Sequence, residues 1–332
     1  MIKNDIRMLF LAHYAPQNLH SPLPTGIKHA VYAEYHYKVF QILKSIFPLT
    51  TPSCNPAIML QENLPFDYIF SLYNRMPFRN SEVFVSSVAE YHGIPYLGAR
   101  PNIRALAEDK HLAKMMARYA GVETPIWHTY NVGSELQPPN FDPPYFCKPR
   151  FGAASVGIDE SSACSSWEEA YRKTVQLHSL GLDVIIEKQI LGTYHTSPVL
   201  NNFGDHIYLP CIAQHSSLKD GIVTYEQKRK IAPGLTRTIV EDQTLQRKLL
   251  AASRRMYPLL QPLDYTRFDY IVDNMGVPYF LEFNVCCNLG EHSTVSQAAK
   301  HIGIGYTELL ENITYSSLYR QGVLNNPFGK KL

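Results

Sequence analysis

Four polar residues near the C-terminus have the types and spacing of a site for metal ions and phosphates. They are Arg267, Asp269, Glu282 and Asn284, in the segment RFDYIVDNMGVPYFLEFN. A turn at 274–276 predicts a hairpin, and side-chain alternation places each pair on one face of its strand. If the two faces coincide, two carboxylates and an amide converge, which are oxygen ligands that Mg²⁺ takes when it also holds phosphates. An ordinary charged solvent face is equally compatible with the spacing, but Glu282 and Asn284 interrupt an apolar strand.

A loop of small residues follows Lys148 in the segment KPRFGAASVGI. Gly152, Ala153, Ala154 and Ser155 leave backbone N–H groups accessible, and such loops bind phosphates. The segment matches neither the Walker A pattern nor G-x-G-x-x-G. Taken alone, it favours a tight turn between strands over a phosphate site.

Three further cations are weaker candidates. Lys110 lies within a predicted helix, EDKHLAKMM, where a single lysine is usually a solvated surface charge. Lys228 and Arg229 lie in the polar loop TYEQKRK, and two adjacent cations can neutralise a phosphate. An exposed basic loop is the more common outcome for such a segment.

The first hundred residues alternate between predicted strands and helices. Strands are expected over 7–12 and 66–74, and a helix lies between them in which Ala33, Val39 and Leu43 can share a face with Ala30. A second helix ends near Gly93, followed by a short strand over 95–97. This alternation predicts a parallel α/β layer.

The rest of the chain predicts further mixed structure. A long helix is expected over 102–121, followed by the strand PYFCKPR, the helix SSWEEAYRKTVQL and the strand DVIIEK. From about Gln189, strands are expected in HTSPVL and HIYLPCIA, then a charged loop over 219–237 and a helix over 241–259. The predicted hairpin and a C-terminal helix from about Ser293 complete the chain.

Length and composition limit the class of protein. The 332 residues exceed what one hydrophobic core usually serves, so two or three domains are expected. The apolar fraction of 45% argues against disorder, and the net charge of +2 lacks the basic excess of nucleic-acid or anionic-membrane binders. Six cysteines without a C-x-x-C pair indicate reduced thiols in a cytoplasmic protein, and no apolar run approaches 18 residues. Small-molecule chemistry is the remaining expectation.

Taken in order, these segments resemble the D-alanine–D-alanine ligase branch of the ATP-grasp superfamily. They run from about residue 95 to 310: PYLGARPNIRALAEDKHLAKMMARYAGVETP, YFCKPRFGAASVGI, VIIEKQILGTYHTSPVL, TYEQKR and RFDYIVDNMGVPYFLEFNVCCNLGEHS. The last is the most specific, with R-x-D, then L-E-x-N, then H-S at a helix start. The resemblance implies an α/β (α+β) ATP-grasp fold of three domains, over 1–105, 106–188 and 189–332. The first is a parallel α/β domain, and the central and C-terminal domains clasp ATP.

The resemblance also implies a reaction and its site residues. ATP would activate a carboxylate as an acyl phosphate, which an amine then attacks, with two Mg²⁺ ions held by Asp269, Glu282 and Asn284. Arg267 would stabilise the charge on the tetrahedral adduct. The implied ATP-binding residues are Lys110, Lys148, Gly152, Ala153, Ala154, Ser155, Glu187, Lys188, Gln189, Ile190, Tyr194 and Lys228. The implied catalytic set is Arg267, Lys228, Arg229 and Ser155, and the implied substrate-binding set is Asn288, His292, Ser293 and Arg229.

Departures from the family pattern fall mostly where the amino acids would bind. Ala154 lacks a serine hydroxyl, Tyr194 stands where the family has a glutamate, and Arg229 replaces a tyrosine. Residues 286–288 (CCN) replace a Thr/Ser-Pro-Gly stretch. Glu34 is the nearest candidate for the family's N-terminal glutamate, and its context does not match. These differences predict an intact reaction with substrates other than two D-alanines, in specialised metabolism and including intramolecular ring closure.

Three alternatives remain open. The protein could be a true D-alanine–D-alanine ligase of cell-wall synthesis, or a nucleotide-binding protein that has lost catalysis. The retained Arg267, Asp269, Glu282, Asn284 and Lys228 argue against the second. A nicotinamide dehydrogenase is disfavoured because no G-x-G-x-x-G follows the first strand. The family resemblance further implies a homodimer acting on small amino-acid-like molecules.

Overall fold

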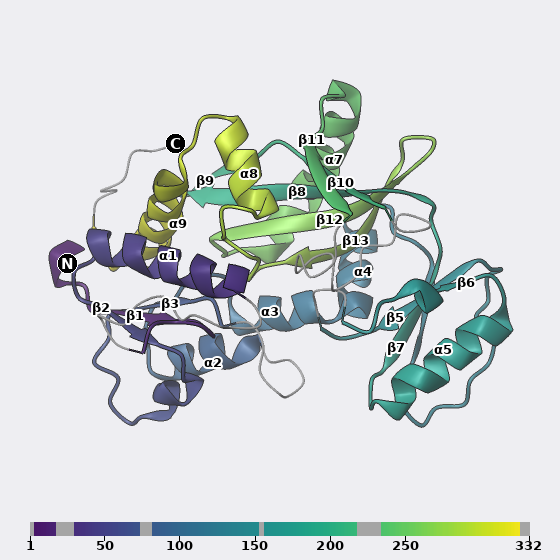
Figure 1. The fold of residues 1–332 in the computed structure, drawn as a ribbon, viewed down its shortest axis with the longest axis horizontal. Coiled ribbons are helices and arrows are strands. Elements are labelled where there is room, and N and C mark those ends of the chain that lie inside the picture. Colours follow the sequence, from purple (N-terminus) through teal and green to yellow (C-terminus); the bar gives the residue numbers. More distant parts are fainter. Residues whose placement is uncertain (1–2, 18–29, 74–81, 153–155, 218–233, 326–332) are drawn as a thin grey trace.

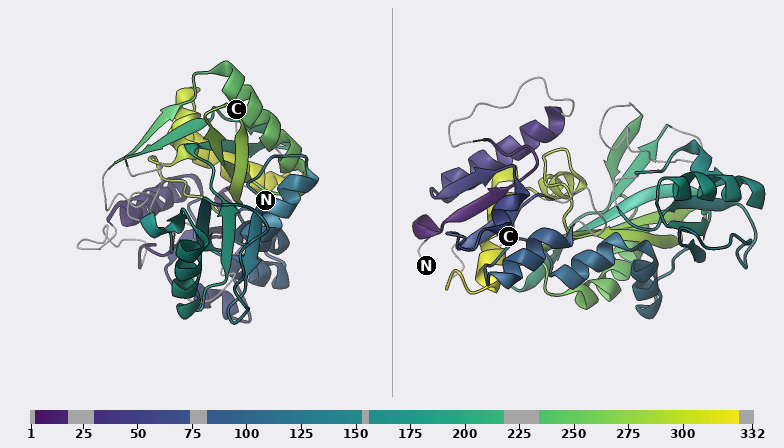
Figure 2. Two further views of the ribbon diagram at one scale, coloured as in Figure 1. Left: turned by 90° about the vertical axis from the view of Figure 1, so that its right-hand side faces the viewer. Right: turned by 90° about the horizontal axis from the view of Figure 1, so that it is seen from below.

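The computed structural model describes residues 3–17, 30–73, 82–152, 156–217 and 234–325, which form three sheets with flanking helices (Figure 1). Each sheet lies within one of the three expected domain ranges, whose limits remain a prediction. Figure 2 shows the unit containing α5 at one end of the molecule and the unit containing α1 at the other. This mixed architecture of several sheets confirms the predicted fold class.

The N-terminal sheet is parallel, as predicted, with the order β2-β1-β3. Its alternating β1 residues face two layers: Met8 and Phe10 pack in the core that includes residues of α1, and Leu9 and Leu11 pack with residues of α2. Strand β2 was not predicted, because its sequence TTPS lacks an apolar pattern. The elements are the 3₁₀ turn Lys3–Asp5, β1 (Met8–Leu11), α1 (Ala30–Ile46), β2 (Thr50–Ser53), the 3₁₀ turn Pro56–Leu60, β3 (Tyr68–Ser71) and α2 (Val83–Tyr91).

Two predictions in the following segment are wrong. Residues 95–97 form only an isolated bridge, between Tyr96 and Ile69, and no strand. The helix expected over 102–121 is two helices, α3 (Pro101–Glu108) and α4 (Lys110–Tyr119). Asp109 interrupts them with an extended backbone, because its carboxylate caps α4 by accepting the N–H groups of His111 and Leu112.

The central sheet is antiparallel, with the order β4-β7-β5-β6, and α5 packs on it. The strands expected in PYFCKPR and DVIIEK are confirmed, as is the helix between them. Strand β6 has two residues, too few to produce a sequence pattern. The elements are β4 (Trp127–Tyr130), β5 (Tyr145–Pro149), the 3₁₀ turn Glu160–Ser162, β6 (Ala163–Cys164), α5 (Trp167–Ser179) and β7 (Val184–Lys188).

The C-terminal sheet has the order β11-β10-β8-β12-β13, with β9 paired to β8. HIYLPCIA forms two strands rather than one, and the expected C-terminal helix is two helices separated around Gly303 and Gly305. The predicted hairpin is confirmed. The elements are β8 (Gly192–Asn202), β9 (Asp205–Tyr208), β10 (Ile212–Ser216), β11 (Leu235–Ile239), α7 (Gln243–Met256), the 3₁₀ turn Tyr257–Leu260, β12 (Tyr265–Asp273), β13 (Pro278–Asn284), α8 (Thr294–His301) and α9 (Tyr306–Arg320). In the described ranges no helix is long and apolar enough to cross a membrane.

A buried carboxylate joins the N-terminal and C-terminal units. Asp264 is fully buried and accepts hydrogen bonds from the backbone N–H of Gly98 at 2.7 Å and from the hydroxyl of Ser317 at 2.6 Å. Arg320 forms an ion pair with it at 2.8 Å. Tyr68 of β3 donates to Ser317 at 2.8 Å, so the network reaches the N-terminal sheet.

Asp264→Asn should lower the free energy of unfolding by about 3 kcal/mol, because it leaves Arg320 without its buried counter-charge. Asp67→Asn is the matched control, since Asp67 pairs with Arg7, whose side chain is 53% exposed, so that solvent screens the pair and its loss should destabilise the protein less. Urea denaturation of both variants measures the difference. Equal effects would show that Asp264 does not join the two units.

Candidate active site

The hairpin brings the four polar residues together. Asp269 on β12 lies opposite Glu282 on β13, and Arg267 lies opposite Asn284. The amide nitrogen of Asn284 donates to Asp269 Oδ2 at 3.2 Å, and Arg267 Nε lies 3.4 Å from the same oxygen. Asp269 is buried and the other three are partly buried, so the alternative of an ordinary solvent face is wrong.

A chain of hydrogen bonds positions the Asp269 carboxylate from the opposite side. Thr196 donates its hydroxyl to Asp269 Oδ1 at 2.8 Å, and Gln214 donates to the Thr196 oxygen at 2.9 Å. Arg237 Nε donates in turn to Gln214 Oε1 at 3.4 Å. Arg237 was not predicted, because its segment was assigned to a charged loop rather than to β11. Its position in that strand is what connects it to the site.

The donor set of this hairpin fits Mg²⁺ better than a transition metal. In the described part of the chain, no group of three or more histidines, cysteines or carboxylates could hold an ion. The hairpin instead offers the carboxylates of Asp269 and Glu282 and the amide of Asn284, which suit a hard cation whose remaining ligands are phosphates and water. Zinc would need additional nitrogen or sulfur ligands.

The charge of Arg267 is stabilised by its neighbours. Burial lowers the pKa of its guanidinium, but the negative charges of Asp269 and, at greater range, Glu282 raise the pKa by more, and the net shift is upward. Nε is buried and makes no hydrogen bond. A permanently charged donor with unused hydrogen-bonding capacity therefore lies beside the two carboxylates.

A second cluster of buried charges lies on β5, β7 and α4. Glu187 Oε1 lies 2.9 Å from the ammonium nitrogen of Lys148 and 3.1 Å from that of Lys114. Lys114 also donates to the hydroxyl of Thr124 at 2.8 Å, and burial lowers its pKa to about 8. Burial alone would raise the pKa of Glu187, but the two lysines lower it. Lys114 was not predicted; its i, i+4 spacing from Lys110 was the available signal.

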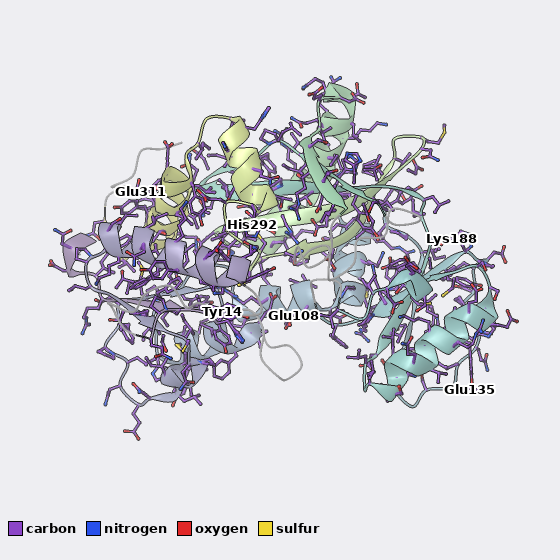
Figure 3. All side chains as sticks on the ribbon, in the orientation of Figure 1. Tyr14, Glu108, Glu135, Lys188, His292 and Glu311 are labelled. Carbon is purple, nitrogen blue, oxygen red and sulfur yellow. The ribbon has the colours of Figure 1, made fainter. Side chains whose placement is uncertain are left out.

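A pocket lies between the central sheet and the C-terminal sheet. Tyr194 is partly buried, and its pKa is raised by burial and then by the negative charges of Glu187 and Glu282. Two lining residues, Ile271 and Leu281, lie on the hairpin strands, so the pocket is close to the hairpin. Lys188, labelled in Figure 3, donates its ammonium group to the carbonyl oxygens of Asp142 and Pro143 within the central unit. The lining residues are Pro125, Phe146, Lys148, Glu187, Lys188, Gln189, Ile190, Tyr194, Ile271 and Leu281. Six of the predicted ATP-binding residues thus share one pocket.

Lys110 is not the solvated surface lysine that its helical context predicted. It is the first residue of α4 and 5% exposed, because the chain breaks at Asp109 and turns the lysine inward. Its ammonium group donates to the carbonyl oxygen of Gly152 at 2.6 Å. Gly152 has φ +90°, a conformation that favours glycine, and its N–H donates to the Glu108 carbonyl at 3.2 Å.

Five predicted site residues lie outside the described residues: Ala153, Ala154, Ser155, Lys228 and Arg229. Their assignment to the phosphate loop and the basic loop stays a prediction.

The predicted substrate-binding residues lie in the loop before α8. Asn288 and His292 are hydrogen-bonded to each other at 3.2 Å, and Ser293 caps the helix by accepting the N–H of Ser296 at 3.1 Å. Tyr35 of α1 accepts the N–H of Leu289 at 3.1 Å, so the N-terminal unit contacts this loop. Figure 3 labels His292 there. The structure brings Asn288 and His292 together and uses the Ser293 hydroxyl as a cap.

Glu187→Gln should lower the free energy of unfolding by about 3 kcal/mol or more, because it leaves two buried ammonium groups facing each other without an anion. Glu135→Gln is the control, because Glu135 is exposed and its replacement should change stability by less than about 0.5 kcal/mol. Chemical denaturation at pH 7 measures both. Equal stabilities would contradict a charged Glu187 between the lysines.

The stability contributed by Lys114 should depend on pH between about 8 and its ordinary pKa of 10.5. In that window the folded protein has lost the proton while the unfolded chain still binds it, so unfolding takes up a proton and the stability contribution rises with pH. Relative to Lys114→Met, the wild-type protein should gain about 1 kcal/mol per pH unit there. Denaturation of both proteins from pH 7 to 10 tests this, and a constant difference would contradict it.

Comparisons with known proteins identify the family of this chain. Residues 116–315 match the family described as D-ala D-ala ligase C-terminus. The D-alanine–D-alanine ligase A of Bacillus cereus is 27% identical over 237 residues, 70% of this chain and 75% of the relative. That of Marinomonas sp. is 26% identical over 291 residues, 86% of this chain and 88% of the relative.

Solved structures show the same fold. The D-alanine–D-alanine ligase of Bacillus anthracis complexed with ATP matches with a TM-score of 0.74 at 21% identity, over 96% of this chain and 99% of that chain. The VanG D-Ala:D-Ser ligase of Enterococcus faecalis matches with a TM-score of 0.70 at 17% identity, over 94% of this chain and 100% of that chain. The family match covers more than half of this sequence. The chain therefore belongs to the D-alanine–D-alanine ligase-like branch of the ATP-grasp proteins, a family of ATP-dependent ligases.

Proposed function

We propose that this protein is an ATP-dependent ligase that joins a carboxylate to an amine through an acyl phosphate, with at least one substrate other than D-alanine. The observation that carries the proposal is the proximity of the pocket to the hairpin. Ile271 and Leu281 line the pocket, and Asp269 and Glu282 lie on the same two strands. A nucleotide in the pocket would direct its phosphates toward these carboxylates.

The lining of the pocket offers the groups that a purine base would contact. Phe146, Ile190 and Ile271 supply apolar walls, and the backbone of 188–190 supplies polar groups at one edge. With the base in this position, Lys148 and Lys110 would lie near the phosphates. The ammonium group of Lys110 donates to the carbonyl oxygen of Gly152 in the proposed phosphate loop. The name of the Bacillus anthracis neighbour, a ligase complexed with ATP, supports the assignment.

The hairpin would perform the chemistry by positioning and charge neutralisation. A carboxylate is a poor electrophile, so its oxygen first attacks the terminal phosphorus, ADP leaves, and the amine then attacks the acyl carbon and expels phosphate. Asp269, Glu282 and Asn284 would hold Mg²⁺, two ions by analogy with the family, which neutralise the phosphate charge when bound. Arg267 would donate to the oxygen that becomes negative in the tetrahedral adduct.

The proposed difference in substrate is supported by the loop after β13. Cys286 and Cys287 are buried, with the pKa of both thiols raised by burial, so they pack as small uncharged side chains. Asn288 is hydrogen-bonded to His292, and Tyr35, which lies on α1, accepts a hydrogen bond from the backbone of this loop. We place the product in specialised metabolism. The proposal further includes a cytoplasmic homodimer with domain limits at 1–105, 106–188 and 189–332.

A second candidate is a D-alanine–D-alanine ligase, favoured by the names of the relatives. One experiment separates the candidates: incubate the protein with Mg·ATP and single amino acids of both configurations, then measure ADP and identify products by mass spectrometry. A dipeptide of D-alanine alone would replace the first proposal by the second. A protein that binds ATP but releases no ADP with any amino acid would be a binding protein without catalysis.

Arg267→Met should lower kcat by about 10² to 10³, because it removes a donor used mainly in the transition state. The dissociation constant for ADP should change little, since ADP lacks the reacting phosphoryl group. Arg247→Met on α7 is the control, because Arg247 is exposed on the outer surface and should retain activity. ADP release and calorimetric ADP binding are the two measurements. Unchanged kcat would exclude Arg267 from the reaction.

A further inference from the structure

Arg237 lies on the site-facing side of the C-terminal sheet. In the cross-strand register, Arg237 pairs with Gln214, Gln214 with Tyr194, and Tyr194 with Ile271. Side chains of cross-strand partners project to the same face. Tyr194 and Ile271 line the pocket, so Arg237 is on the pocket face although β11 is the edge strand.

The surroundings of Arg237 are those of a functional side chain rather than a solvent-facing one. Its neighbours in β11, Thr236 and Thr238, are exposed on the opposite face, whereas Arg237 is partly buried. Within the described ranges no carboxylate lies within 4.0 Å of it. Its hydrogen bond to Gln214 is long, at 3.4 Å. A purely structural arginine would be better satisfied than this.

A second positive charge lies near Arg237. Burial lowers the pKa of its guanidinium, and repulsion by Arg267 lowers it further, while Tyr32 and Asp269 act in the opposite direction. Geometry agrees, because the chain from Arg237 through Gln214 and Thr196 ends on Asp269, which Arg267 approaches from the other side at 3.4 Å. Arg267 thus contacts Asp269 directly and Arg237 is connected to it through two side chains, an arrangement of two cations that a bound oxyanion would stabilise.

We propose that Arg237 is an additional catalytic residue that donates, together with Arg267, to the oxygens of the phosphoryl group transferred from ATP. This inference rests on the proposed function. The ligand proposed for Arg237 is the terminal phosphate of ATP and not a carboxylate of the substrate, for two reasons. Arg237 lies in the same cross-strand row as the pocket residues Tyr194 and Ile271, and it is connected by hydrogen bonds to Asp269, one of the proposed Mg²⁺ ligands. A planar guanidinium donates to two phosphate oxygens in a fixed fork geometry, whereas a lysine ammonium is a point charge without that geometry.

The test compares two nucleotides that differ by the terminal phosphate. For Arg237→Met, calorimetry in Mg²⁺ should give at least a tenfold higher dissociation constant for AMP-PNP, a nonhydrolysable ATP analogue, and less than a twofold change for ADP. The dissociation constant of Arg237→Lys for AMP-PNP should lie between those of the wild-type protein and Arg237→Met, because lysine keeps the positive charge but lacks the planar guanidinium group. Arg247→Met should change neither constant, and unfolding temperatures check that all variants fold.

The possible results separate the role of Arg237 from the proposed function as a whole. Equal weakening of AMP-PNP and ADP, or no change in either, overturns the assignment of Arg237 to the transferred phosphoryl group. A raised KM for the amino-acid substrate with unchanged AMP-PNP binding overturns it in favour of a substrate carboxylate. If the wild-type protein binds neither nucleotide, the proposed function itself fails together with this inference. If Arg237→Met does not fold, the Lys variant must still weaken AMP-PNP relative to ADP.

Discussion

The pairing of Glu187 with two lysines is the interaction on which the arrangement of the pocket depends. Lys114 comes from α4, which packs on β13, and Glu187 comes from the central sheet. Thr124, which accepts from Lys114, donates to the carbonyl of Phe280 on β13 at 2.8 Å. Breaking this pairing would leave buried charges uncompensated, which is costly in a low dielectric. The cluster therefore holds the two walls of the pocket in one relative position.

Balanced net charge conceals strong local fields. The sum of +2 over the chain hides a buried concentration of positive charge at Lys114, Lys148 and Arg267 against Glu187 and Asp269. Such charges persist inside a protein only when they are paired or when a ligand completes them. Glu187 contacts two of these cations and Asp269 contacts one, so the cations outnumber the carboxylates and would attract a polyanionic ligand without the excess basicity of a nucleic-acid binder.

The hairpin could be predicted from the sequence, whereas the burial of its supporting cations could not. Alternation and a turn at 274–276 are local signals, so they predict the hairpin, but Asp269 lies opposite Glu282 only because the register shifts between Asp269 and Tyr270, which no local signal predicted. Lys110 faces inward because Asp109 leaves the helix, and Asp109 is held by Arg150, 41 residues later, at 2.6 Å. The burial of Lys114 on α4 likewise depends on Glu187 of β7, and the position of Arg237 on β11 depends on Gln214 of β10. Short strands such as β2 and β6 exist only because neighbours complete them.

The residues proposed for the reaction and those proposed for specificity lie in different kinds of structure in this chain. The residues proposed for phosphoryl transfer lie on paired strands. A change of pairing by one residue along such a strand would move its side chains to the other face of the sheet. The residues proposed for substrate binding lie in the loop before α8, whose conformation is set by the contact between Asn288 and His292 and by Tyr35 of α1. Loops of this kind accept substitutions that a strand register does not. A change of substrate therefore need not alter the chemistry proposed for the hairpin. The sequence has this pattern, because residues 286–288 (CCN) depart from the family whereas the R-x-D and L-E-x-N motifs of the hairpin do not.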